Sequence, residues 1–499
     1  MNNTKYDIVI IGSGLGALVS GYILSKEKYK VCILEKNTQI GGTLQCFKRD
    51  GCVFDTGMHY IGSLDKGQIL HRIFKYFNLL DKINVKKMDE DGFDIFNING
   101  VEYKYAMGYN KFTKTLISYF PEEEHAIKKY TKKIREVANS LDLYNLRETS
   151  MNEMINVDYV KVNAWDFIKS LTKNERLQNV LAGLNSLYAG KPESTPLYVH
   201  ALINNFYIES AYRLIDGSAQ IADLLAEGII NNGGVVLKKK KVEKFIFDNK
   251  SLIAVELSDK QKYYADYFIS NIHPAVTMDM IEPGKIRKAY KNRLKSLENT
   301  ISSFSLYIIL KENCFKYINA NYYYYKNDSV WGVANYNEDT WPDGYMLFTS
   351  PSSKSDKYAK CITVITYMKF EEMKKWENTW IEKRGDDYKK MKQQKAEKLL
   401  DLVEKKFPDI RKYIKLYYTA TPLTYRDYIG TYDGSMYGIV RNCNNPMQSY
   451  IFPRTKIPNL LLTGQNINLH GILGVTIGAI LTCGELIGVN NLINKINNA

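Results

Sequence analysis

Residues 7–17 read DIVIIGSGLGA, an apolar run that leads directly into a glycine-rich turn. The run predicts a buried β-strand, and the residues after the turn predict a helix. In such a unit, Gly12 permits the tight turn, Gly14 lets a pyrophosphate approach the backbone, and Ala17 is small enough for the helix to pack on the strand. We therefore predict a dinucleotide-binding turn at this end of the chain.

A carboxylate follows the second predicted strand. Residues 30–34 read KVCIL and are followed by Glu35. An acid in this place accepts hydrogen bonds from the hydroxyls of an adenosine ribose and argues against a ribose that carries a 2′-phosphate. The helix that opens at Leu15 and Gly16 would direct its N-terminal N–H groups at the phosphates. We expect Leu15 and Gly16 to contact the cofactor, together with Glu35 and the adjacent Lys36.

Two further glycine patterns follow within the next 25 or so residues. A double glycine precedes Thr43, and residues 55–57 read Asp-Thr-Gly. In large flavoproteins, a double glycine here passes the pyrophosphate, and a later Asp-x-Gly turn brings the backbone near the flavin ring. We therefore predict that Gly42, Thr43, Asp55 and Gly57 contact FAD, and that the protein is a flavoprotein rather than a simple nicotinamide dehydrogenase.

A matching element lies near the other end of the chain. Residues 460–478 read LLLTGQNINLHGILGVTIG, which predicts a strand and then a glycine-rich helix that starts near Gly474. Such a helix would point its positive end at the flavin and stabilise negative charge on it. The residues predicted to contact the cofactor here are Gly464, Gln465, Asn466, Gly474 and Val475.

Several stretches together resemble one family. Residues 41–62 (GGTLQCFKRDGCVFDTGMHYIG), 421–430 (TPLTYRDYIG) and 463–479 (TGQNINLHGILGVTIGA) are similar to the retinol saturase, phytoene desaturase and carotenoid isomerase superfamily of FAD proteins. The resemblance runs nearly end to end and includes residues 212–225 (YRLIDGSAQIADLL). It implies that the backbone near Val242 meets the adenine.

Two positions depart from the pattern of this superfamily. Thr43 stands where many relatives carry an arginine that touches the phosphates, and Gln465 and Asn466 replace an acid that often binds the ribityl chain. Amide groups still form hydrogen bonds with hydroxyls. The departures therefore leave the cofactor prediction in place and mark a subfamily.

The resemblance implies an α/β fold with a Rossmann-like FAD-binding domain of the glutathione-reductase type. This domain is expected to be discontinuous, with an inserted α+β substrate domain. The first insertion is expected to be mainly helical, as in residues 122–139 and 164–181, and the second to contain strands at 302–310 and 361–368. The expected segments are 1–75, 205–285 and 455–499 for the FAD-binding domain, and 76–204 and 286–454 for the substrate domain.

Two histidines are the candidates for catalysis. His59 follows the Asp-x-Gly turn, and we expect it near the substrate, as a proton donor or as a positioning group. His470 lies in the C-terminal loop beside the predicted flavin edge and is the second candidate. A structural role for either histidine is the alternative. The remaining histidines have no comparable context, and no group of them has the spacing of a metal site.

The resemblance implies an FAD-dependent oxidoreductase that acts on carbon–carbon double bonds of a hydrophobic isoprenoid or polyene. The direction stays open, either saturation as in retinol saturase or dehydrogenation as in phytoene desaturase. A redox-neutral cis–trans isomerase that uses reduced FAD is an alternative within enzymes. With no second glycine fingerprint, NAD(P)H could act only as a transient electron donor. A non-catalytic lipid carrier of the prenyl-escort type would be expected to erode the phosphate turn, which is intact here.

Composition limits the other classes of function. The 499 residues carry a net charge of +14, but no zinc-finger, helix-turn-helix or RNA-binding pattern, which argues against nucleic acid as a partner. Seven irregularly spaced cysteines form no disulfide framework and suit a cytoplasmic setting. Lysines between 374 and 415 could support a peripheral membrane contact, although a solvated helix face is the alternative. The sequence leaves the oligomeric state open.

Overall fold

A seven-stranded sheet carries the predicted turn. The computed structural model describes residues 5–149, 158–352 and 357–499. The strands follow the order β10-β2-β1-β13-β12-β11, and β19 pairs with the C-terminal end of β13. The strands of this first sheet are β1 (Lys5–Ile11), β2 (Val31–Leu34), β10 (Val235–Leu237), β11 (Val242–Asp248), β12 (Ser251–Leu257), β13 (Lys262–Ser270) and β19 (Leu460–Leu462).

The central strand β1 is buried on both faces, as its apolar run predicts. Ile8 and Ile10 pack into the hydrophobic cluster on one face, and Val9 and Ile11 pack into the cluster on the other. β1 runs parallel to both of its neighbours, β2 and β13. Parallel strands that are covered on both faces carry continuous apolar runs of this kind. The predicted α/β, Rossmann-like class is confirmed.

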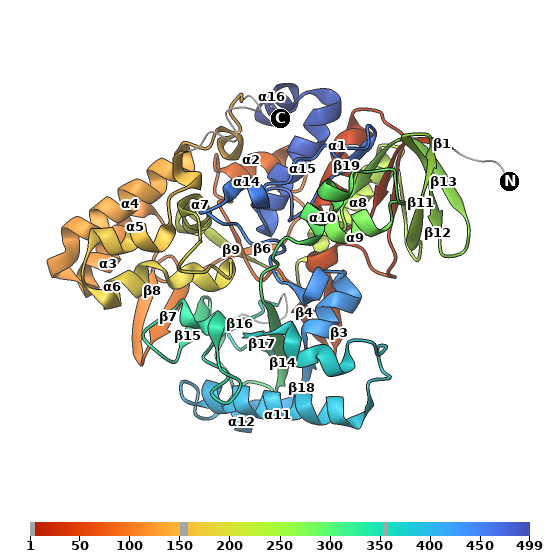
Figure 1. Cartoon of the computed structure of the whole chain (residues 1–499). Helices are drawn as coiled ribbons and strands as arrows, with labels where there is room; N and C mark the ends of the chain where they lie inside the picture. The colour runs from red at the N-terminus through yellow and green to blue at the C-terminus, as the bar shows by residue number, and fades with distance from the viewer. Residues whose placement is uncertain (1–4, 150–157, 353–356) are drawn as a thin grey trace.

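Helices from distant parts of the chain cover one face of this sheet. α1 (Leu15–Lys26) packs against α8 (Ala219–Asn231) and α15 (Gly471–Ile487). Figure 1 shows these helices beside the sheet, with β11 and β12 at its outer edge. The other helices around this half of the molecule are α2 (Ile69–Tyr76), α9 (Pro274–Asp279), α10 (Lys288–Lys295) and α16 (Val489–Asn497).

A second seven-stranded sheet lies below the first in Figure 1, with α11 (Gly385–Glu404) across its lower side. Its order is β18-β14-β17-β16-β15-β7-β8. The strands expected at 302–310 and 361–368 are present as β14 and β17. The strands of this sheet are β7 (Asp94–Ile98), β8 (Val101–Tyr105), β14 (Ser302–Leu310), β15 (Asn321–Tyr325), β16 (Gly344–Thr349), β17 (Cys361–Met368) and β18 (Ile414–Ala420).

The first insertion contributes helices and also a hairpin to this second sheet. The hairpin β7–β8 turns at Asn99 and Gly100, both with positive φ, and β7 pairs with β15. The expectation of a mainly helical segment missed this hairpin, although Asn-Gly between strand-like runs is a strong hairpin signal. The helices of this segment are α3 (Tyr109–Tyr119), α4 (Glu124–Asn139), α5 (Ala164–Leu171), α6 (Glu175–Leu181) and α7 (Leu197–Glu209).

Two small sheets connect the halves of the molecule. The β3–β4 hairpin packs through Phe47 and Phe54 on Tyr307 of β14. This contact holds the chain that follows β4 between the two large sheets. The strands are β3 (Cys46–Arg49) and β4 (Cys52–Asp55) in one sheet, and β5 (Ile61–Gly62), β6 (Val85–Lys87) and β9 (Ala211–Leu214) in the other. The remaining short helices are α12 (Ile410–Tyr413), α13 (Pro422–Thr424) and α14 (Pro446–Ser449).

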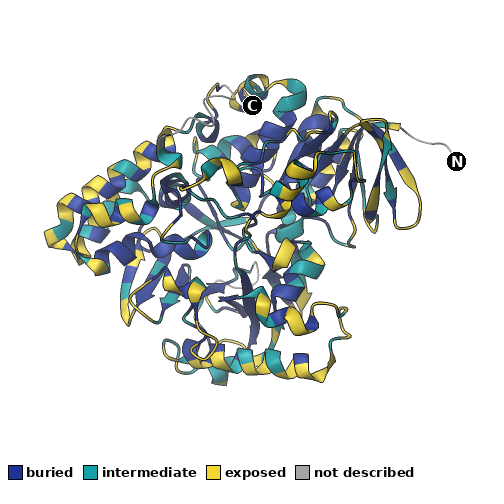
Figure 2. Cartoon of the chain, in the orientation of Figure 1, coloured by how far each residue is buried: buried dark blue, intermediate teal, exposed yellow. Residues whose placement is uncertain are grey.

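The strands of the first sheet come from chain segments that are far apart, at 5–34, 235–270 and 460–462. The domain boundaries proposed from the sequence stay a prediction. Figure 2 shows buried strands inside the molecule and exposed residues along the outer sides of α3, α4 and α11.

Among the residues that the structure describes, no helix has both the length and the apolar character needed to cross a membrane.

Candidate functional site

A cavity of ≈ 260 Å³ lies at the carboxyl ends of β1 and β2. We call it the glycine-turn cavity. In open α/β sheets, ligands bind outside the carboxyl ends of the strands. Most of the residues predicted to contact the dinucleotide line it: Gly12, Gly14, Leu15, Gly16, Glu35, Lys36, Gly42, Thr43, Val242, Gly464, Gln465, Asn466 and Val475.

The turn itself has the geometry that its glycines predict. Gly12 has φ +85°, a conformation that residues other than glycine rarely adopt. Gly14 caps α1, and no side chain supplies a capping hydrogen bond there. The first N–H groups of α1 therefore keep free donor capacity at the cavity, where an anion such as a phosphate would accept it.

The sequence analysis missed Asn271, which packs between the two glycine turns. A Cβ atom on Gly14 would lie 2.7 Å from Asn271 Nδ2, and one on Gly464 would lie 2.8 Å from Asn271 Oδ1. Asn271 lines the cavity, and its buried Oδ1 has no hydrogen-bond partner among the described residues. The signal for it was a polar residue directly after a parallel strand, the place where α/β folds bind ligands.

The buried carboxylate of Glu35 joins the turn to the second strand. Its Oε2 accepts hydrogen bonds from Ser13 N (2.9 Å) and Ser13 Oγ (2.6 Å), and its Oε1 accepts one from Asn37 N (2.8 Å). A carboxylate offers about four lone-pair sites. Glu35 therefore holds the turn and retains capacity to accept a hydrogen bond from a ribose hydroxyl.

A short segment from the second insertion covers this cavity. The π-helical turn Tyr425–Ile429 is followed by Gly430, and Tyr428 to Thr431 line the cavity. Asn37 Nδ2 donates to Tyr428 O (2.7 Å), and Lys36 Nζ donates to Asp427 O (3.3 Å). Burial lowers the pKa of Lys36. Lys36 therefore lies on the cavity wall and also helps to hold this segment in place, and its contact with the cofactor stays a prediction.

A second cavity, of ≈ 170 Å³, adjoins the first. We call it the histidine cavity, because His59 and His470 both line it. It shares Leu15, Thr43, Gln465 and Val475 with the glycine-turn cavity. Gly57 and Gly474, predicted to lie near the flavin, also line it. Its other walls are largely apolar or aromatic and include Phe206, Tyr207, Met346, Phe348, Ile365 and Met436.

Helix α15 begins at this cavity, although earlier than predicted. Its first residue is Gly471 rather than a residue near Gly474. Gly471, Ile472 and Leu473 line the cavity together with Gly474 and Val475. The positive end of the helix therefore faces the cavity with its whole first turn.

His59 lies against the wall of the histidine cavity. Its ring stacks on Phe348, with centroids 4.3 Å apart, and its buried Nε2 has no hydrogen-bond partner among the described residues. Burial, and secondarily the positive charge of Arg213, lower the pKa of His59 to about 3. The imidazole is therefore neutral at physiological pH, which favours the positioning role over that of a protonated donor.

His470 is the residue before α15, and its ring is held by a hydrogen bond to a backbone carbonyl. His470 Nε2 forms a hydrogen bond with Leu187 O (2.9 Å), and burial lowers its pKa to about 4. Because Nε2 must donate to a carbonyl, Nδ1 is the acceptor of this neutral ring. His470 is fixed at the cavity and uncharged.

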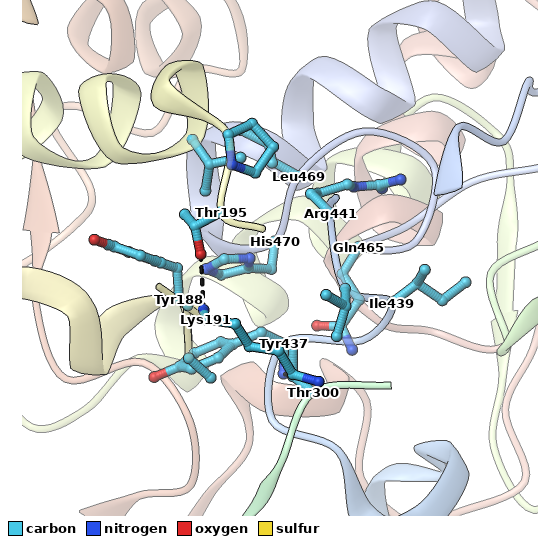
Figure 3. A pocket seen from close by; sticks show the side chains of 15 residues that line it. Tyr188, Lys191, Thr195, Thr300, Tyr437, Ile439, Arg441, Gln465, Leu469 and His470 are labelled. Atoms are coloured by element: carbon cyan, nitrogen blue, oxygen red, sulfur yellow. Dashed lines mark hydrogen bonds between the residues drawn. The ribbon is translucent and has the colours of Figure 1, made fainter. Parts of the chain in front are cut away.

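A small third cavity of ≈ 30 Å³ lies on the other side of His470. Figure 3 shows His470, Gln465 and Tyr437 at its wall, with Lys191 and Thr195 nearby. His470, Gln465 and Tyr437 also line the histidine cavity. A space of this size holds about one water molecule. Polar residues such as Lys191 and apolar residues such as Val199 and Ile439 line this space together, beside His470.

Two of the predicted residues take other places. Asp55 is buried behind the turn, where its Oδ1 accepts a hydrogen bond from Ser218 N (2.7 Å) and one from Cys46 Sγ (3.2 Å). Burial raises the pKa of Asp55. Its carboxylate thus holds the segment before α8 rather than facing either cavity. Ala17 is fully buried within α1 and serves the helix packing that its size predicts.

Comparisons with known proteins agree with this architecture. A model of the NAD(P)-binding Rossmann-like domain matches residues 10–77. The all-trans-retinol 13,14-reductase of Rattus norvegicus is 29% identical over 99% of this chain and 87% of its own length. A chloroplastic prolycopene isomerase of an Oncidium hybrid cultivar is 23% identical over 98% and 85%. A 4,4'-diapophytoene desaturase of Methylomonas sp is 27% identical over 62% and 61%.

Solved structures share the fold at low sequence identity. A putrescine oxidase bound to putrescine has a TM-score of 0.63 and 12% identity, and covers 97% of this chain and 99% of its own. A Rab GDI from Plasmodium falciparum has a TM-score of 0.53 and 13% identity over 98% and 99%. In sequence the chain is therefore similar over nearly its whole length to retinol 13,14-reductases and prolycopene isomerases, and over 62% of it to a diapophytoene desaturase, and it contains a Rossmann-like domain.

Proposed function

We propose that the protein is an FAD-dependent oxidoreductase that acts on a carbon–carbon double bond of a hydrophobic polyene. FAD fits the residues of the glycine-turn cavity. The N–H groups at the start of α1 lie around the turn, as does Asn271 Oδ1, which has no partner in the described part of the chain, and Glu35 offers acceptor capacity for a ribose. When bound, FAD supplies hydride chemistry, and the protein supplies orientation and electrostatics.

The observation that carries the proposal is the shared wall of the two cavities. Leu15, Thr43, Gln465 and Val475 contribute to both, so a molecule that fills the polar glycine-turn cavity reaches the apolar histidine cavity. A cofactor with a polar dinucleotide and a flat redox-active ring matches this change of character. An apolar substrate matches the remaining walls, such as Phe206 and Met346.

The chain's own groups would act by position and by excluding water. Neutral His59 is stacked on Phe348 and offers one ring nitrogen to a substrate in the histidine cavity. The first turn of α15 presents positive N–H dipoles that stabilise negative charge in the same place. His470 is the second polar group at this wall, beside space for a water molecule.

The first test is the visible absorption spectrum of the purified protein, with mass identification of the released cofactor. Bound FAD is expected. All-trans-retinol and prolycopene are then incubated with the protein under reducing and oxidising conditions. A product two hydrogens heavier indicates saturation, and one two hydrogens lighter indicates dehydrogenation. A colourless protein that also fails to take up added FAD would overturn the proposal.

The isomerase alternative is supported by the prolycopene isomerase relatives. It predicts a product of unchanged mass and altered chromatographic retention, formed only while the flavin is kept reduced. NAD(P)H as the transient electron donor predicts flavin bleaching when NADH or NADPH is added without oxygen. No bleaching with either would assign the electrons to another donor.

We also infer a peripheral membrane contact at the loop before α11. Trp380 is 80% exposed and Ile381 38% exposed, and lysines 374, 375 and 383 flank them in sequence. An exposed tryptophan among lysines suits an anionic lipid surface. Sedimentation with phosphatidylserine vesicles tests this. Trp380→Ala is expected to lower the bound fraction severalfold, and an unchanged fraction would contradict the contact.

A further inference from the structure

Two cysteines from distant parts of the chain meet where the β3–β4 hairpin packs on the second sheet. Cys52 is the first residue of β4, and Cys361 is the first residue of β17. Both belong to the small hydrophobic cluster that contains Phe54 and Tyr307. In Figure 1, β3 and β4 lie beside β14 and β17. The contact that holds the hairpin in place thus also brings the two thiols together.

The hydrogen bonds of the two thiols show how near they lie. Cys52 Sγ donates to the carbonyl of Lys360 (3.6 Å), the residue before Cys361. Cys361 Sγ donates to the carbonyl of Val53 (3.8 Å), the residue after Cys52. The two thiols also act on each other as side-chain hydrogen-bond partners. A disulfide requires two side chains that point toward each other over a short distance, and this pair has that orientation.

The surroundings make Cys52 the more reactive thiol of the pair. Its hydrogen-bond partner Cys361 has the largest effect and lowers the pKa of Cys52. The positive charges of Lys360 and Lys415 act in the same direction, and together these effects outweigh burial and the negative charge of Asp50. The pKa of Cys361 is raised instead, first by its hydrogen bond with Cys52 and then by burial. Because the thiolate is the nucleophilic form of cysteine, Cys52 is the better nucleophile.

Cys52 is buried but lies next to the surface. The Cys52 residue is 6% exposed, and it directly follows Asp50 and Gly51, which are both exposed. An exposed ion pair between Lys415 Nζ and Asp50 Oδ2 (2.6 Å) ties this turn to β18, and exposed ion pairs add little stability. Local opening of such a turn costs little free energy. A small oxidant therefore reaches Cys52 when the turn opens.

We propose that Cys52 and Cys361 form a redox-active dithiol, which hydrogen peroxide converts to a reversible disulfide between β4 and β17. The Cys52 thiolate attacks one oxygen of the peroxide, the O–O bond breaks, and the other oxygen leaves as hydroxide and takes up a proton. The resulting sulfenic acid on Cys52 is attacked by the Cys361 thiol, so the S–S bond forms and a second water leaves. The two sulfur atoms together lose the two electrons that reduce the peroxide.

This bridge would join two elements that both contribute to the histidine cavity. The chain that follows β4 continues to Gly57 and His59, and β17 contains Ile365. These three residues line that cavity. The disulfide would thus tie two of its walls together, although it lies at the first residue of each strand and touches neither histidine.

Two other cysteines serve as comparisons. Cys46 donates to Asp55 Oδ1 (3.2 Å), and burial raises the pKa of Cys46 to about 12. Cys314 is half-buried and donates to Lys311 O (2.9 Å). In the part of the chain that the structure describes, neither thiol forms a hydrogen bond with another cysteine. Exposure alone would make Cys314 the first thiol to be oxidised, whereas the dithiol predicts Cys52.

The test treats the purified full-length protein, fully reduced and freed of reductant, with a small molar excess of hydrogen peroxide. The intact protein should become two hydrogens lighter and lose two thiols in a titration under denaturing conditions. Proteolysis and mass spectrometry should then identify one peptide pair, linked through Cys52 and Cys361. Dithiothreitol should restore both thiols, because a disulfide is reversible and the higher oxidation states of cysteine are not.

Single substitutions separate the roles of the two thiols. Cys361→Ser removes the resolving thiol, so the sulfenic acid on Cys52 should persist and react with dimedone. Cys52→Ser should show neither the bridge nor this adduct. Cys314→Ser is the matched control and should form the bridge as the wild type does. The peptide map of the wild type gives the same answer without any variant, so a variant that fails to fold leaves the test intact.

Three results would overturn the proposal. The first is a wild-type protein that keeps both thiols in peroxide, and the second is one that adds oxygen to Cys314 before any bridge forms. The third is a bridge that joins other cysteines or that still forms in Cys52→Ser. None of these measurements uses FAD or a substrate, so failure of the proposed function would leave this inference unaffected.

Discussion

The glycine-turn cavity and the histidine cavity share a wall but are built in opposite ways. The first is made of backbone from short motifs, in which glycines leave room and helix α1 supplies N–H groups. The second is made of side chains from many separate segments, among them Met58, Phe206, Phe348, Met436 and Leu469. The glycine motifs define a backbone binding site for the cofactor, which we call the cradle. Side-chain packing instead defines the shape of the histidine cavity. The difference predicts which substitutions affect cofactor binding and which affect substrate.

The largest expected effect breaks the cradle alone. In Gly16→Val, a Cβ atom would lie 2.8 Å from the backbone of Gly464 and 2.6 Å from Asn271 Oδ1. Backbone cannot move aside cheaply, so FAD affinity should fall by about 3 kcal/mol, or about 150-fold, as measured by titration of the apo protein. Gly332→Ala is the control, because its Cβ meets nothing closer than 3.9 Å. Full FAD occupancy in a folded Gly16→Val protein would refute the cradle.

A substitution in the other cavity should separate turnover from cofactor binding. His59→Ala is expected to keep FAD and to lower kcat about 100-fold, because it removes the neutral imidazole at the substrate wall. His59→Phe keeps a ring to stack on Phe348 and should lose as much. If His59→Phe retains wild-type kcat, the ring nitrogen has no part in turnover. Because the pKa of His59 is about 3, no limb of the kcat profile near pH 6.5 should depend on it.

Asn271 tests the part of the cradle that the motifs did not indicate. Asn271→Asp is nearly isosteric but puts an acid between the two glycine turns, beside the expected phosphates. FAD should bind about tenfold more weakly, and the effect should be smaller at high salt. The affinity for all-trans-retinol should change far less than the affinity for FAD. An equal loss for both ligands would mean that the fold is perturbed.

The smallest effect concerns acid stability and comes from the histidine cavity. The folded pKa values of His59 and His470 are about 3 and about 4, below the ~6.5 of an unfolded histidine. Between these values the unfolded chain binds protons that the folded chain does not, so their contribution to stability is full above pH 6.5 and is lost as pH falls.

His59→Phe should therefore flatten the decline of Tm between pH 6.5 and 4 by a few degrees, measured by differential scanning fluorimetry. His125→Gln, on the exposed side of α4, is the control and should leave the decline unchanged. A slope identical in wild type and His59→Phe would show that His59 is protonated in the folded state over this range.

The cradle was more predictable than the substrate side. Gly12, Glu35 and Gly464 are near in sequence to the strands that position them, so their places follow from strand, turn and helix geometry. Asp55 belongs to a motif too, but its carboxylate turns to Ser218, a partner 163 residues away. The predicted start of α15, near Gly474, was too late, because the helix begins at Gly471.

The sequence by itself determined the Rossmann-like turn, the acid after the second strand and the similarity to retinol saturases and their relatives, since these depend on local spacing and small residues. Tertiary structure decided what could not be local: Asn271 beside Gly14, His59 on Phe348, and Cys52 beside Cys361. Burial also decided the charge of the histidines, because removal from water disfavours the protonated ring. Local chemistry specifies how a cofactor is held, while the shape that selects a polyene exists only after distant side chains have packed together.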